Sequence, residues 1–178
     1  MPPAALRRAD RTVIPGPGLP SLESLGITSD DLYDETWLAQ NTPSLLNTSL
    51  GDSSSTPGPN RLHRRVSCLP RMNVDKANAR ACLAYLTRAG NTNGCGTRVP
   101  GTPTACPPAA NGALCSAGCA QITGCAYRTI EAVSACSDVA YGGHVIMREC
   151  SREGDFTSGG HDVAWGNGNF IVGFLGCR

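Results

Sequence analysis

The sequence predicts an α+β fold, a disulfide-rich α/β sandwich in which two short helices pack on an antiparallel β-sheet behind a largely irregular segment. Three observations carry this prediction. Apolar residues recur at helical spacing in two segments, a strand–turn–strand pattern lies close to the C-terminus, and all ten cysteines fall at or after Cys68. The cysteines therefore mark the part of the chain that is expected to fold.

The first 65 of the 178 residues are predicted to be mostly irregular. They contain eight of the thirteen prolines and no cysteine, and their apolar residues are too sparse for a separate core. Residues 22–38 are the exception, because their apolar spacing predicts a short helix with Ser29 as its N-cap. Such a helix is marginal alone and would become ordered by docking on the rest of the protein. We therefore divide the chain into a segment at 1–65 and a domain at 66–178.

Two helices are predicted inside the cysteine-rich domain. Residues 73–88 repeat apolar side chains every three or four positions, and Gly90 supplies a stop signal. Residues 126–136 carry a shorter apolar stripe, formed by Tyr127, Ile130 and Val133. Between the two helices, residues 90–113 are rich in glycine, proline and asparagine, which predicts a long loop.

The remaining segments predict strands. Residues 139–150 are expected to form a strand with a kink at Gly142-Gly143. Residues 161–165 and 169–175 flank the turn residues Gly166-Asn167-Gly168, and this pattern predicts a β-hairpin because glycine and asparagine accept positive φ.

The cysteines are expected to form disulfides. Their even number fits five bridges, whose pairing the sequence leaves open. No C-x-x-C motif occurs, so we expect neither a metal site nor a cofactor. Disulfides persist in oxidising compartments, which predicts a secreted, extracellular protein whose signal peptide has already been removed. The predicted disulfide-forming residues are Cys68, Cys82, Cys95, Cys106, Cys115, Cys119, Cys125, Cys136, Cys150 and Cys177.

Two modification sites are predicted at or before the boundary between the two parts. Leu62 lies two positions before the dibasic pair Arg64-Arg65, a pattern that resembles the sites cut by kexin- or furin-type secretory proteases. Cleavage after Arg65 would make residues 1–65 a propeptide. Asn47, in Asn-Thr-Ser, is a predicted N-glycosylation acceptor.

Catalytic residues are not expected, and one alternative stays open. His144 and His161 are the only histidines after the cleavage site, and Glu149 lies near His144 in sequence. Two histidines and a carboxylate are the groups that a secreted ribonuclease uses for acid–base chemistry. The sequence contains no recognised nucleophile or phosphate-binding motif, so both histidines are predicted to be ordinary structural residues.

Charge and hydrophobicity restrict the function classes. The net charge is +1, which removes the electrostatic basis for nucleic-acid binding, so no nucleic-acid partner is expected. No apolar run reaches the length of about 20 residues that spans a bilayer. Trp165, near Asn167 and Asn169, leaves open a carbohydrate-binding module because it could stack on a sugar, although a buried tryptophan is the more frequent case.

Together, the dibasic site, the cysteine-rich domain and the helix–helix–sheet order resemble small secreted fungal effectors and killer toxins made with a propeptide. The glycine-bracketed segment 142–150 and the closing segment 162–177 also resemble the α/β-sandwich members of that class. The resemblance implies a protease-resistant protein, released by a processing protease, that acts by binding rather than by catalysis. Its implied partner is a host or microbial protein, membrane or cell wall, and we expect the protein itself to be a monomer.

Overall fold

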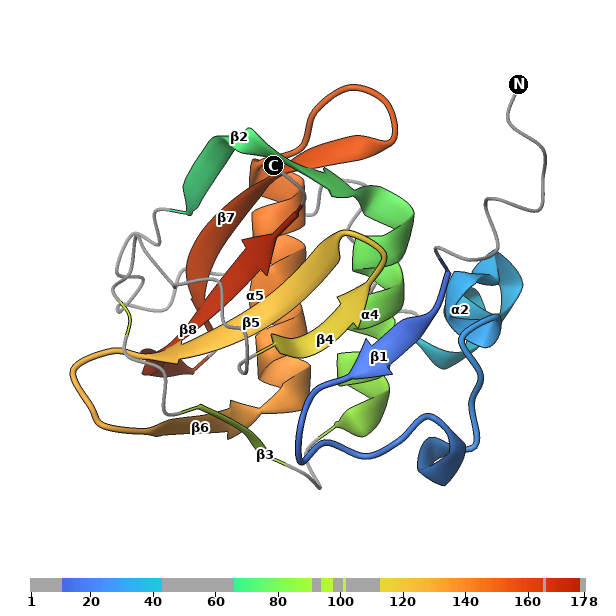
Figure 1. The fold of residues 1–178 in the computed structure, drawn as a ribbon, viewed down its shortest axis with the longest axis horizontal. Helices are drawn as coiled ribbons and strands as arrows, with labels where there is room; N and C mark the ends of the chain where they lie inside the picture. Colours follow the sequence, from blue (N-terminus) through green and yellow to red (C-terminus); the bar gives the residue numbers. More distant parts are fainter. Residues whose placement is uncertain are drawn as a thin grey trace, which may run out of the picture.

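The computed structural model describes residues 11–42, 66–90, 94–97, 101, 113–164 and 166–176. Within them, α4 (Lys76–Ala89) and α5 (Cys136–Glu149) pack on one face of a six-stranded antiparallel sheet (Figure 1). In spatial order, the strands are β1 (Val13–Pro15), β4 (Ala113–Ala117), β5 (Ala120–Ala126), β8 (Asn167–Leu175), β7 (Phe156–Ala164) and β2 (Ser67–Asp75). The predicted α+β fold class is therefore confirmed.

Several predicted site residues fall outside the described part of the chain, and the structure says nothing about them. They are Asn47, Leu62, Arg64, Arg65, Cys106, Trp165 and Cys177.

Helix α4 confirms the first predicted helix. The Asp75 side chain caps it by accepting a hydrogen bond from the Asn78 backbone amide, 2.8 Å away. Gly90 ends it with a φ of 62°, a conformation that glycine adopts at little cost. The helix begins at Lys76 rather than at residue 73, because the residues before it pair with β7 as the end of β2.

The strand predicted at residues 139–150 is wrong, because this segment belongs to α5. Gly142 and Gly143 are not a strand kink. They let the helix approach its neighbours, since a Cβ on Gly143 would overlap the Leu83 side chain of α4. A Cβ on Gly142 would lie 3.1 Å from the carbonyl oxygen of Val163 on β7. Close packing on both sides therefore favours glycine inside a helix, where it is otherwise unfavourable.

The helix predicted at residues 126–136 is also wrong. Ala126 ends β5, a turn follows, and β6 (Ala132–Ala135) leads directly into α5. Ile130 is 91% exposed and Val133 58% exposed, so two members of the apolar stripe do not reach the core. Within the predicted loop 90–113, residues Gly94–Thr97 form β3, which pairs with β6 in a separate two-stranded sheet.

The predicted hairpin is confirmed as β7 and β8. The two strands pair antiparallel, with Asp162 opposite Val172, and Gly166 in the turn has a φ of 74°. Strand β7 is longer than predicted and begins at Phe156.

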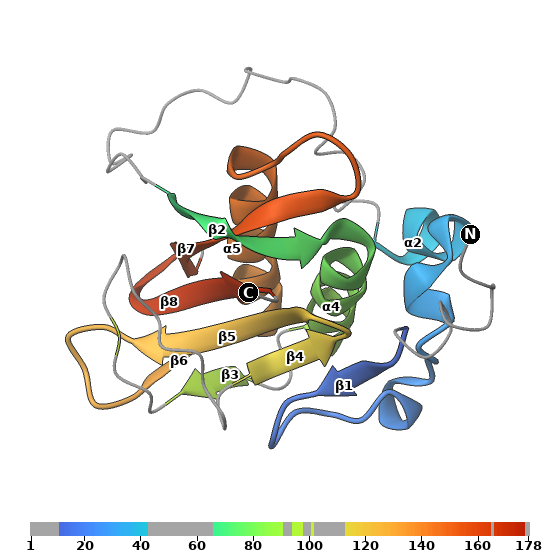
Figure 2. The same cartoon turned by 45° about the horizontal axis from the view of Figure 1, so that its top comes forward.

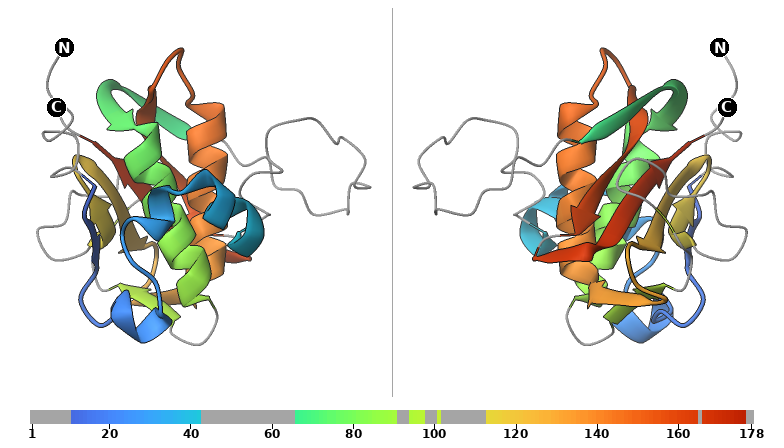
Figure 3. Two further views of the ribbon diagram at one scale, coloured as in Figure 1. Left: turned by 90° about the vertical axis from the view of Figure 1, so that its right-hand side faces the viewer. Right: turned by 90° about the vertical axis from the view of Figure 1, so that its left-hand side faces the viewer.

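Residues 11–42 contain four short elements that pack on the domain: β1, η1 (Glu23–Leu25), η2 (Asp31–Tyr33) and α2 (Glu35–Asn41). The helix predicted at 22–38 is therefore wrong over most of its length. Ser29 is not an N-cap, because its Oγ accepts a hydrogen bond from the Val13 amide; Asp34 caps α2 instead. Figure 3 shows this segment lying over the outer side of α4.

Three disulfides link the layers: Cys68–Cys150, Cys82–Cys115 and Cys95–Cys136. Cys119 and Cys125 are disulfide-bonded as well, so all eight cysteines in the described residues are oxidised. The bridge with the largest sequence separation, 82 residues, joins β2 to the residue that follows α5.

Replacing both Cys68 and Cys150 by alanine is expected to lower the free energy of unfolding by about 4 kcal/mol, because the lost crosslink no longer restricts the unfolded chain. Urea unfolding followed by circular dichroism measures this change. A decrease below about 1 kcal/mol would show that the bridge does not stabilise the fold.

Candidate functional site

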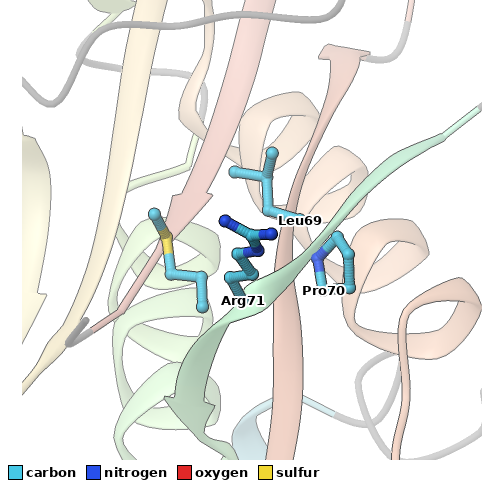
Figure 4. A pocket seen from close by; sticks show the side chains of 4 residues that line it. Leu69, Pro70 and Arg71 are labelled. Carbon is cyan, nitrogen blue, oxygen red and sulfur yellow. The ribbon is translucent and has the colours of Figure 1, made fainter.

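A surface pocket of about 650 Å³ lies at the outer edge of the sheet on β2. Among the described residues, its lining is formed by Leu69, Pro70, Arg71 and Met72, which combine three apolar side chains with one guanidinium group. Figure 4 shows Leu69 and Arg71 extending from the same side of the strand, with Pro70 on the other side. The arrangement therefore presents a cation beside an apolar surface.

The described lining of this pocket lies on a β-bulge. The register of β2 against β7 shifts between Leu69 and Asn73, so the residues between them leave the regular ladder. Pro70 lies within the bulge and has no backbone N–H to donate, which restricts it to edge strands and irregular positions. The sequence thus places a proline where the strand departs from its partner.

Arg152, which follows α5, holds the bulge in place. Its guanidinium donates to the carbonyl oxygen of Pro70 and, at 3.2 Å, to Oδ1 of Asn73. Lys76 in turn donates to the carbonyl oxygens of Arg152 and Gly154, each at 2.7 Å. The pocket backbone is therefore fixed by two cations that do not line the pocket.

The pocket opens on the face of the sheet opposite to the helices. Leu69 pairs with Gly159, and a Cβ built on Gly159 would lie 3.0 Å from the sulfur of Met72. A Cβ on the next residue, Gly160, would instead lie 2.8 Å from Ile146 of α5. Since successive strand residues point to opposite faces, Gly160 faces the helices and Leu69 faces away from them.

The chemistry of the pocket suits binding. Arg71 is exposed and able to form charge-assisted hydrogen bonds with a carboxylate or phosphate. Among the described residues that line the pocket there is no nucleophile and no general base. The described part of the chain also contains no group of three or more His, Cys, Asp or Glu side chains that could hold a metal ion.

The sheet separates the two predicted catalytic histidines. His144 lies on α5, whereas His161 alternates with Gly160 on β7 and therefore faces the other side of the sheet. The two side chains are 6% and 2% exposed. Glu149 is at the surface, where it forms an ion pair with Arg148 at 2.9 Å. The structure thus does not bring these three residues together in an open site.

His144 is buried as a neutral residue. Neither of its ring nitrogens has a hydrogen-bond partner among the described residues. Burial, and next the positive charge of Arg80 on α4, lower the pKa of His144 from 6.5 to about 4. Protonating it therefore costs folding free energy, so the folded protein holds the ring in the neutral form near pH 7.

Sequence reasoning missed the pocket because it missed β2. Proline and arginine in Pro70-Arg71 weaken the strand signal, and a register shift leaves no regular alternation to detect. Arg152 carried no signal either, since its partners Pro70 and Asn73 lie 82 and 79 residues away in the sequence. Pro70 is the one local sign in the sequence of an edge strand or a bulge.

Comparison with known proteins gives one match. Residues 63–175 match the family model described as "Domain of unknown function (DUF8794)". No curated protein and no solved structure matches the chain. No helix within the described residues is long and apolar enough to cross a membrane.

The protein is expected to lose stability as the pH falls from 6.5 to 4. The unfolded chain protonates His144 near pH 6.5, whereas the folded protein holds it neutral down to about pH 4. His144→Leu should abolish this contribution, so the variant should lose less stability on acidification than the natural protein. Between pH 7 and pH 4, the free energy of unfolding of the variant minus that of the natural protein should increase by about 3 kcal/mol.

Urea unfolding at both pH values measures the difference between the two proteins. An Arg80→Gln variant is the control, because removing the nearby charge should weaken the acid sensitivity without abolishing it. Equal acid sensitivity in the natural protein and His144→Leu would contradict the interpretation.

Proposed function

The chain belongs to the DUF8794 family, whose function is unknown, and within that family we propose that it is a secreted effector or toxin. It acts by binding a host or competitor target and is released by cleavage after Arg65. The disulfide scaffold provides resistance to unfolding and proteolysis outside the cell.

The extent of the family match supports this division of the chain. The match begins at residue 63, beside the predicted cleavage site, and covers the cysteine-rich part. Residues before it lie outside the family domain. A removable leader and a functional domain would produce this pattern.

The β2 pocket is the observation that carries the binding proposal. It is held by hydrogen bonds from Arg152 and by the Cys68–Cys150 bridge, so it is preorganised for a ligand. Within the described residues, its lining combines the apolar side chains of Leu69, Pro70 and Met72 with the exposed cation of Arg71, which suits a partner that presents an apolar group next to an acidic one.

The alternative, a ribonuclease that uses His144 and His161, has less support. The two rings are buried on opposite sides of the sheet, and a phosphodiester would have to reach both. Incubating the protein with RNA tests this alternative. Cleavage that is lost in a His161→Ala variant would favour the hydrolase over the binding proposal.

Arg71→Glu is expected to weaken target binding by at least about tenfold, because it places a negative charge where the partner's acidic group binds. The measurement is the binding of fluorescently labelled protein to plant leaf cells and to competing microbial cells over a concentration series.

Arg88→Glu is the matched control, since Arg88 is also an exposed arginine but lies on α4, away from the pocket. It should bind as the natural protein does. If no cell type binds the natural protein, or if the two variants lose binding equally, the pocket proposal fails.

Intact-mass analysis of secreted material tests the processing, with a chain that begins at Val66 as the expected result.

A further inference from the structure

Residues 11–42 lie outside the family match but complete its sheet. Strand β1 pairs antiparallel with β4, with Val13 opposite Ala117 and Pro15 opposite Cys115 (Figure 2). The Gly16 amide then donates to the carbonyl oxygen of Leu114 at 2.9 Å. Residues 11–42 thus supply the outermost strand of the sheet at this edge.

The same segment also covers α4. Leu32 and Ile27 are 0% and 5% exposed and belong to the main core. The Tyr33 hydroxyl donates to Oδ1 of Asn78 on α4, and the Tyr85 hydroxyl of α4 donates to the carbonyl oxygen of Pro20, both at 2.7 Å. Burial raises the pKa of Tyr85 to about 12, in keeping with a closely packed contact.

Within residues 11–42, hydrogen bonds connect β1 to the turn and short helices that follow it. The Val13 amide of β1 donates to Oγ of Ser29 at 3.1 Å, which joins the strand to the turn before η2. Asp31 accepts hydrogen bonds from the amide and hydroxyl of Thr28, each at 2.7 Å. The strand and the short helices therefore dock as one unit.

The surface beneath the segment is itself preorganised. The Cys82–Cys115 disulfide joins α4 to β4, so a covalent bond outside residues 11–42 restricts their relative position. Strand β4 reads Ala-Leu-Cys-Ser-Ala, which contains no charge and no proline. An uncovered edge of this composition readily accepts another strand.

We propose that the β4 edge and the adjoining face of α4 form a peptide-acceptor site, and that residues 11–42 occupy it non-covalently after cleavage. This proposal rests on the processing step of the proposed function. Because residues 1–65 contain no cysteine, no disulfide can tie them to the domain after cleavage. The processed protein is then a two-chain complex held by strand pairing and apolar contacts.

The test cleaves the full chain at a specific protease site inserted between residues 43 and 65. Both fragments should elute together on size-exclusion chromatography in native buffer and separate in denaturant with the disulfides intact. Native mass spectrometry should give the summed mass. Separate elution in native buffer would overturn the proposal.

Matched variants in β1 show whether the contact is the one described. Val13 is 2% exposed and Ile14 57% exposed, so the two neighbours face the core and the solvent. After cleavage, Val13→Asp should raise the dissociation constant at least tenfold, and Ile14→Asp should leave it unchanged. Equal retention of both variants would overturn the assignment of β1 as the anchoring strand.

A second variant guards against a Val13→Asp protein that fails to fold. A Cβ at Gly16 would overlap the backbone carbonyl of Ala113, so Gly16→Val should also release residues 11–42 after cleavage.

The inserted protease site keeps this test separate from natural processing after Arg65. Failure to cut after Arg65 removes the processing step alone, whereas free fragments after the inserted cut remove the acceptor site alone.

Discussion

The close approach of α5 to both α4 and β7 is the constraint on which the rest of the fold depends. A Cβ on Gly143 would lie 2.4 Å from Cδ2 of Leu83 on α4, so the Leu83 side chain would have to move, and Gly142 lies against the Val163 backbone and the Val172 side chain. Adding either methyl group would require the neighbouring side chain or backbone to shift, and overpacking of this kind typically costs about 1–3 kcal/mol. The spacing of helices and sheet is therefore set at one turn of one helix.

Disulfides anchor both ends of that helix. Cys136, its first residue, is bonded to Cys95 of β3, and Cys150, which follows its last residue, is bonded to Cys68 of β2. The second bond lies next to the β2 bulge, whose backbone accepts hydrogen bonds from Arg152 just beyond the helix. The disulfide and Arg152 therefore fix the pocket residues of β2 relative to the end of α5.

Features set by local sequence could be predicted, and those set by packing could not. Helix α4 and the β7–β8 hairpin carry their own capping and turn residues, at Asp75, Gly90 and Gly166. Helix α5 was misassigned because Gly142-Gly143 is unfavourable in an isolated helix and becomes favourable only against Leu83 and β7. The pocket depends on pairing between residues far apart in the chain, for which the sequence offers only Pro70 as a signal.

Both outer strands of the sheet carry a proline, Pro15 at the end of β1 and Pro70 in the β2 bulge. At these positions a second copy approaching either edge finds no amide hydrogen to continue the ladder. Each outer strand therefore carries a position that disfavours sheet growth from molecule to molecule. A protein built this way should resist edge-to-edge aggregation even at high concentration.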